Sequence, residues 1–208
     1  MRRAVLFIAA ALCFVFADKA HAQRALPGMR GLEIRGGMVD GFHSSGSRNE
    51  LGYYFGAGMA TYTKNANKWV FGAEYLNRYY PYKDGRIPVV QFTGEGGYYY
   101  KFMADGSKTF FFYLGASAMA GYETVNWGDN LLYDGSTIQH LAAAGVRRSS
   151  TIQNKDKFLY GGAITLQVDV YLTDKVILLL TGRERILWGT TTGHFHTQFG
   201  IGLKFMIH

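Results

Sequence analysis

The chain has 208 residues, with 22 Lys and Arg against 15 Asp and Glu, so its formal net charge is +7. Residues 1–22 are typical of a cleaved secretory signal, because Arg2 and Arg3 precede an apolar stretch and a small-residue A-x-A site closes it at 20–22. Without them, 186 residues remain, with 19 basic and 14 acidic side chains and a net charge of +5. The single cysteine, Cys13, lies in the removed segment, which excludes a disulfide, a cysteine metal ligand and a thiol nucleophile in the exported protein.

The exported chain is rich in glycine and aromatic residues and poor in proline. It holds all 27 glycines, all 15 Tyr, all 3 Trp, 12 of the 15 Phe and only 3 Pro. This composition favours extended backbone with aromatic surfaces. The longest aliphatic run, 176–180, is far shorter than the ~20 apolar residues of a transmembrane helix, which excludes a helical membrane protein.

Alternation of apolar and polar side chains, the pattern of a β-strand, recurs along the exported chain. In 31–42, for example, Leu32, Ile34 and Met38 alternate with Glu33 and Arg35. The same period of two runs through seven further segments. The predicted strands are 31–42, 51–63, 68–82, 86–103, 108–125, 157–172, 176–190 and 194–208.

The length of these segments decides between a soluble sheet and a membrane barrel. Soluble strands have ~5 or 6 residues, whereas a tilted strand needs ~9 to 11 residues to cross a bilayer, and most of the predicted strands are longer than that. Unpaired backbone groups cannot face lipid, so the sheet must close. We therefore expect an all-β fold, an eight-stranded antiparallel up-and-down transmembrane β-barrel over 31–208, preceded by a periplasmic tether at 23–30.

The lengths of the connections agree with this topology. With both termini in the periplasm, the second, fourth and sixth links face the periplasm, and these are compact turns at 64–68, 104–107 and 173–175. The long link at 126–156 is the fifth and faces outwards, as do the links at 43–50, 83–85 and 191–193.

The two faces of the predicted strands differ in chemistry. The apolar face would contact lipid, with aromatic side chains near the strand ends as an interfacial girdle. The girdle residues are Trp69, Tyr79, Tyr98, Tyr100, Phe110, Tyr160 and Trp188. A soluble lipocalin-like carrier would need the reverse, an apolar lumen and a polar exterior.

The opposite face carries five acids and five bases, which we expect to pair inside the barrel. These residues are Glu33, Arg35, Glu74, Arg78, Glu95, Glu123, Asp169, Arg183, Arg185 and Lys204. An eight-stranded barrel is just wide enough to be filled by its own side chains, so we expect no open pore for DNA or protein. Glu184, on the lipid face near the outer rim, has no role in this scheme.

Several short strings, in this order and spacing, resemble the TraO family of conjugal transfer proteins encoded on conjugative transposons. They are GAEY at 72–75, RIPV at 86–89, GEGGY at 94–98, GYET at 121–124, LYDG at 132–135 and the segment 176–189, which ends in RERILWG. The resemblance covers nearly all of the exported chain and implies an outer-membrane component of a conjugative DNA-transfer apparatus, with other apparatus proteins as partners. It brings no catalytic residues. Two features depart from what we expect of the family. The stretch 137–150 makes the outward loop longer, and the chain ends in His208 in place of an aromatic residue.

Rim residues offer an alternative function, an outer-membrane lipid-modifying hydrolase or acyltransferase. Ser149 or Ser150 with His194 or His196 and an acid such as Asp156 could form a nucleophile, base and acid. Loops rich in Ser, His and Asp are ordinary solvated surface, so a non-enzymatic protein is favoured. The His194-x-His196 pair lacks a third ligand, which favours a structural role over metal binding, and no cofactor is expected.

The basic residues do not form a nucleic-acid site. They are scattered, with Arg147 and Arg148 in the long loop and Lys64, Lys68, Lys108 and Lys175 at periplasmic turns. Cations at a barrel rim fit anionic lipid headgroups. We therefore expect contact with outer-membrane lipid and no direct contact with nucleic acid.

Overall fold

The computed structural model describes residues 26–40, 52–82, 85–107, 109–125, 131–133, 149–151, 156–190 and 194–207. The predicted signal at 1–22, the first residues of the tether, the 43–50 loop and most of the 126–156 loop lie outside the described residues.

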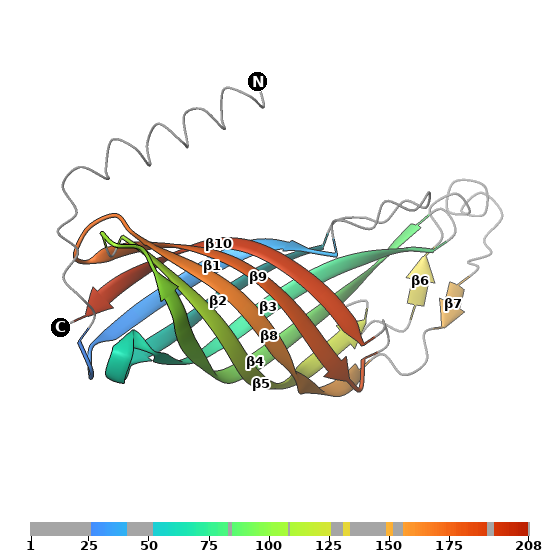
Figure 1. Ribbon diagram of the computed structural model, residues 1–208. Helices are drawn as coiled ribbons and strands as arrows, with labels where there is room; N and C mark the ends of the chain where they lie inside the picture. Colours follow the sequence, from blue (N-terminus) through green and yellow to red (C-terminus); the bar gives the residue numbers. More distant parts are fainter. Residues whose placement is uncertain are drawn as a thin grey trace, which may run out of the picture.

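Eight long strands form one closed antiparallel barrel, and this confirms the predicted fold class (Figure 1). Around the barrel they follow the order β1-β10-β9-β8-β5-β4-β3-β2, so consecutive strands of the barrel are neighbours and the last strand pairs with the first. Their bounds are β1 Arg30–Val39, β2 Gly52–Tyr62, β3 Lys68–Tyr82, β4 Gly85–Ala104, β5 Phe110–Val125, β8 Asp156–Tyr171, β9 Val176–Trp188 and β10 Phe195–Ile207.

Two features were not predicted from the sequence. A short second sheet pairs β6, Leu131–Tyr133, with β7, Ser149–Thr151, inside the expected 126–156 loop. The strands also differ in length: β1 has 10 residues and β4 has 20, so one side of the barrel wall extends further than the other. In Figure 1 the β6–β7 sheet lies at the end of the barrel away from the start of β1 and the end of β10, which we call the termini end.

The turns at the termini end are compact because side chains and positive φ angles close them. The 3-10 turn η1, Lys64–Ala66, places Asn65 at φ 62° and Ala66 at φ 60°. Asp105 Oδ1 accepts hydrogen bonds from the N–H groups of Thr109 and Phe110 at 2.8 and 3.0 Å. Such side-chain acceptors replace the missing strand partners and fix tight turns.

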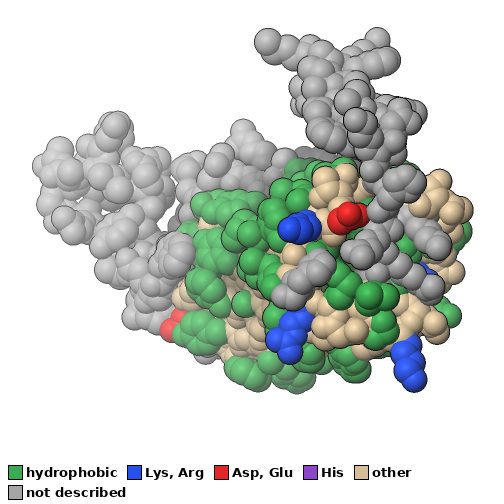
Figure 2. Space-filling model, turned by 90° about the vertical axis from the view of Figure 1, so that its left-hand side faces the viewer, with side chains coloured by type: hydrophobic (Ala, Val, Ile, Leu, Met, Phe, Trp, Pro, Cys, Tyr) green, Lys and Arg blue, Asp and Glu red, His purple; other side chains and the backbone are tan. Residues whose placement is uncertain are grey.

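The alternation of residues along each strand separates an apolar exterior from a buried interior. In β1, Leu32 is 44% exposed on the outside, whereas Glu33 is 1% exposed in the lumen. Figure 2 shows the end of the barrel where the termini lie, with apolar side chains over the wall and basic side chains at the rim. This is the reverse of the arrangement that a lipocalin-like carrier would need. Among the described residues, no helix has the length and apolar character needed to span a membrane.

The interior is not purely polar. Towards the termini end it holds an apolar and aromatic cluster of Ala60, Tyr62, Val70, Tyr99, Phe111, Tyr113, Tyr171, Ile177, Leu179 and Met206. The described part of the predicted tether lies against it, because Met29 packs on the cluster and Gly28 N–H donates to the Tyr62 carbonyl oxygen at 2.8 Å.

Candidate functional site

The lumen contains three clusters of charged side chains, stacked along the barrel axis. The inner cluster joins Lys68, Lys204, Glu33 and Asp169, which come from β3, β10, β1 and β8. Lys204 Nζ lies 2.6 Å from Asp169 Oδ2 and 3.2 Å from Glu33 Oε1, and Lys68 Nζ lies 3.0 and 3.7 Å from the same two atoms. Two acids thus balance two bases, and all four side chains are buried.

Neutral side chains complete the inner cluster. Lys204 Nζ donates to Tyr62 OH at 2.9 Å, and Gln167 Nε2 donates to Asp169 Oδ1 at 2.6 Å. Lys68 Nζ lies 4.2 Å from the ring centroid of Tyr113, a cation–π distance. Hydrogen bonding of this kind is what allows ion pairs to be buried without a large penalty.

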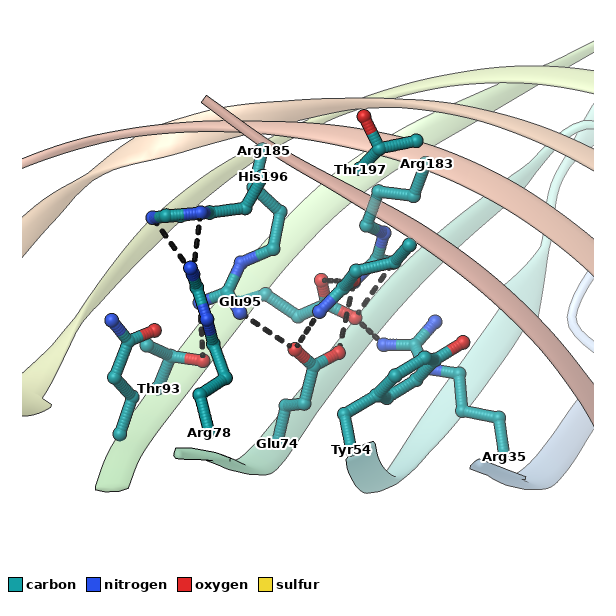
Figure 3. A network of polar contacts seen from close by, with 12 residues as sticks. Arg35, Tyr54, Glu74, Arg78, Thr93, Glu95, Arg183, Arg185, His196 and Thr197 are labelled. Carbon is teal, nitrogen blue, oxygen red and sulfur yellow. Dashed lines mark hydrogen bonds and ion pairs between the residues drawn. The ribbon is translucent and has the colours of Figure 1, made fainter. Parts of the chain in front are cut away.

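The middle cluster is a chain of arginines and glutamates (Figure 3). Arg183 Nη1 lies 2.8 Å from Glu95 Oε2 and 3.2 Å from Glu74 Oε2, so it bridges the two acids. Arg185 Nη1 lies 3.1 Å from Glu74 Oε1, and Arg35 forms an ion pair with Glu95. The rigid guanidinium group can donate hydrogen bonds to several acceptors at once, which suits a side chain that spans the lumen.

Hydroxyl and amide groups fix the orientation of the middle cluster. Arg183 donates to Thr165 Oγ1 at 3.0 Å and to Tyr99 OH at 3.1 Å, and Gln198 Nε2 donates to Glu74 Oε1 at 2.9 Å. These contacts link β9 to its neighbour β8 and to β4 across the lumen, and β10 to β3. The side chains therefore occupy the interior and leave the barrel plugged.

The outer cluster lies where β1 ends. Arg78 Nη2 lies 2.9 Å from Asp40 Oδ2, and His196 Nδ1 lies 2.6 Å from Arg78 Nη1 and 3.2 Å from Asp40 Oδ2. Thr197 N–H donates to Asp40 Oδ1 at 2.9 Å. Burial alone raises the pKa of Asp40, but the hydrogen bond to His196, the charge of Arg78 and the Thr197 N–H outweigh it and hold this pKa below its usual value.

Of the ten charges predicted for the interior, the structure places nine fully inside and Arg78 half-buried at the outer end. Glu123 lies apart from the three clusters, and its Oε2 accepts hydrogen bonds from Gln91 Nε2 and Thr190 Oγ1, both at 2.8 Å.

Sequence reasoning was wrong about Lys68, which was assigned to a periplasmic turn. Its side chain is 0% exposed and points into the lumen, because β3 begins at this residue. Alternation could have revealed this, since Lys68 lies one position before the outward Trp69 and so shares the inward face of Glu74. The sequence analysis also missed Asp40 and the inward His196, and nothing in the local pattern marks Asp40.

Of the rim residues of the enzyme alternative, the two described histidines point in different directions. His196 points inwards, whereas His194 is exposed, with Nδ1 2.9 Å from the Leu187 carbonyl oxygen and its ring beside Trp188. The two imidazoles therefore do not share a face, because β10 begins at Phe195 and His194 lies outside its alternation. The side chains of Ser149 and Ser150 lie outside the described residues. Within the described residues there is no group of three potential metal ligands.

The seven predicted girdle residues lie on the described strands, towards their ends. Trp69 and Tyr98 meet edge to face, with ring centroids 5.0 Å apart, and Tyr160 and Trp188 stack at 6.2 Å. Tyr100 and Phe110 are exposed on the outside, and Tyr79 is half-buried with its OH 3.5 Å from Asn77 Nδ2.

An up-and-down antiparallel barrel with an apolar wall and a charged, filled lumen defines the class of this protein, an outer-membrane-type β-barrel. The model of one family, described as conjugative transposon protein TraO, matches residues 26–207. The chain belongs to this family, which confirms the resemblance drawn from its sequence strings.

The chain is similar to several solved structures. The attachment invasion locus protein Ail of Yersinia pestis, in complex with the heparin analogue sucrose octasulfate, is similar with a TM-score of 0.50 at 8% identity, covering 88% of this chain and 100% of that one. Neisserial surface protein A, NspA, gives a TM-score of 0.47 at 11% identity over 85% of this chain and 95% of that one. The N-terminal β-barrel domain of Pseudomonas aeruginosa OprF gives 0.43 at 10% identity over 86% and 99%. No curated protein sequence matches the chain.

Proposed function

We propose that this protein is a non-enzymatic, structural component of a conjugative DNA-transfer apparatus in the outer membrane of a Gram-negative bacterium. The observation that carries the proposal is membership of the TraO family over residues 26–207, because that family is one of conjugative transposons. The apolar outer wall supports insertion into a membrane, and the signal predicted at 1–22 supports export to it.

The filled lumen supports a scaffolding role over a conducting one. Arg185, Lys68, Lys204 and Asp169 are each 0% exposed, so the barrel offers no path for DNA. A plugged barrel can act on other apparatus proteins only through its ends and its wall. We propose that partners dock at the end where the termini lie, which presents the exposed Lys64 and Lys175, and on segment 23–30.

Conjugation frequency tests this proposal. The gene is deleted from the mobile element and complemented with the wild type, with Lys64→Glu plus Lys175→Glu, or with the charge-conserving control Lys64→Arg plus Lys175→Arg. We expect deletion to abolish transfer, the arginine control to restore it and the charge reversal to restore it only in part. Unchanged transfer after deletion would overturn the proposal. Fractionation and heat-modifiable gel migration check that each variant is a folded outer-membrane barrel.

A further inference from the structure

Glu184 is a carboxylate on the outer wall of the barrel. Its neighbours along β9 on the same face are Gly182 and Ile186, while Arg183 and Arg185 on either side point into the lumen and are buried. Among the described residues its polar partner is Thr197 of β10, whose Oγ1 donates a hydrogen bond to Glu184 Oε2 at 2.6 Å. The register pairs the two residues directly, so they lie side by side on the wall.

Glu184 lies deeper in the wall than the outer rim, near which the sequence placed it. It precedes Trp188, an exposed residue of the predicted girdle, by four positions, which is about 13 Å along the strand and about 10 Å along the membrane normal at a tilt of roughly 40°. A carboxylate at this depth is costly unless it meets another protein group. Because an ionised carboxylate has about four acceptor sites, one threonine hydroxyl leaves most of them unused.

The wall is hollowed one outward position away from Glu184, where Gly182 pairs with Phe199. The hollow that these two residues line has a volume of about 470 Å³, and another of about 630 Å³ lies on the far side of β10. Phe199 and Ile201 stand between the hollows as exposed apolar side chains. The first hollow is lined on its outer side by Leu166, Leu180, Gly182 and Phe199.

We propose that the Glu184–Thr197 pair and the adjoining hollow form a docking site for a membrane-embedded segment of a different protein that carries a Lys or Arg at this depth. Charge complementarity carries the choice, since the site has unused acceptors and no described basic side chain on the outer faces of β8, β9 and β10 beside it. A second copy that docks through this same face therefore offers no cation there. Lipid ammonium groups stay at the headgroup level, about 10 Å away from Glu184.

A synthetic transmembrane helix tests this site. The barrel is reconstituted in phosphatidylcholine vesicles with a labelled 20-residue leucine helix that bears one Lys about seven residues from its end, about 10 Å below the interface. The matched control helix has Leu at that position. Energy transfer between labelled barrel and helix reports binding. We expect the Lys helix to bind about tenfold more tightly than the Leu helix, as charge-assisted hydrogen bonds in a membrane would give.

Two barrel variants assign the effect to the site. Glu184→Leu removes the acceptor and is expected to abolish the preference for the Lys helix, whereas Thr197→Val keeps the carboxylate and is expected to preserve it. Heat-modifiable migration confirms that both barrels are folded. Equal binding of the two helices to the wild type would overturn the proposal. So would a Glu184-dependent association of two barrels without helix, which would identify a second copy as the occupant. The outcome does not depend on any role in conjugation.

Discussion

Lys204 Nζ lies 2.6 Å from Asp169 Oδ2 in the lumen, and both side chains are completely buried. Asp169 also contacts Lys68 at 3.0 Å, so one carboxylate holds two ammonium groups whose residues lie 136 positions apart in the sequence. Only barrel closure brings β3, β8 and β10 together around Asp169. Substitutions at this contact therefore test how the charged side chains that fill the lumen stabilise the barrel.

Asp169→Ala is expected to destabilise the barrel strongly. It leaves two buried lysines with Glu33 alone, and removing one partner of a buried ion pair costs about 3–5 kcal/mol. Urea unfolding in lipid vesicles, followed by gel migration of unboiled samples, measures the loss.

The double variant Asp169→Leu plus Lys204→Met is the control for that experiment. It removes one acid and one base together and leaves Lys68 with Glu33, 3.7 Å apart. Replacing a buried pair by apolar groups of similar volume is often neutral, so most of the stability should return. A double variant as unstable as Asp169→Ala would argue against charge balance as the cause.

Gly161→Ala is expected to destabilise the β8–β9 pairing. A Cβ at Gly161 would overlap the carbonyl oxygen of Ile186 and lie 3.0 Å from Leu187 Cα, both main-chain atoms that cannot move independently. Overpacking of this kind costs about 1–3 kcal/mol. At Gly94, which faces outwards, the nearest atom to a Cβ is 3.8 Å away, so Gly94→Ala is the matched control and should not destabilise. Unfolding midpoints of the two variants compare them, and equal midpoints would contradict the steric argument.

The outer cluster is expected to respond to acid. Because the pKa of Asp40 is lower in the folded state than in the unfolded state, its stabilisation is full above about pH 4 and is lost as the pH falls through the lowered folded value. The NMR shift of the Thr197 amide, which donates to Asp40, should report a midpoint below the usual ~3.9 of aspartate. Asp40→Asn should abolish this transition, and a midpoint at or above 3.9 would contradict the assignment.

The reconstituted barrel is expected not to conduct ions. Its lumen is crossed by Arg183, which contacts Glu74 and Glu95, and is closed towards the termini by the inner cluster. Planar bilayer recordings, with a porin as the positive control, should show no open channel. Stable single-channel steps from the folded protein would contradict a permanent plug.

The sequence by itself determined the barrel and its two faces. A side-chain period of two assigns each residue of a strand to one face, so Glu33, Glu74 and Asp169 could be placed inside from their neighbours alone. The lengths of the links then indicated which end of the barrel faces the periplasm and which faces outwards. Lys68 was misplaced because it was assigned to the neighbouring turn, although it follows the alternation of β3. The β6–β7 sheet was not foreseen because strands of three residues are too short to show a period of two.

Only the tertiary structure decided which charges meet. Glu33 lies 171 positions from Lys204 in the sequence, and the sign of a charge does not specify its partner. Barrel closure and strand register set the three clusters apart along the axis and place Thr197 beside Glu184. The start of β10 at Phe195 separates His194 from His196. The physical reason is that alternation is a property of each strand, whereas depth and partner depend on how neighbouring strands are staggered.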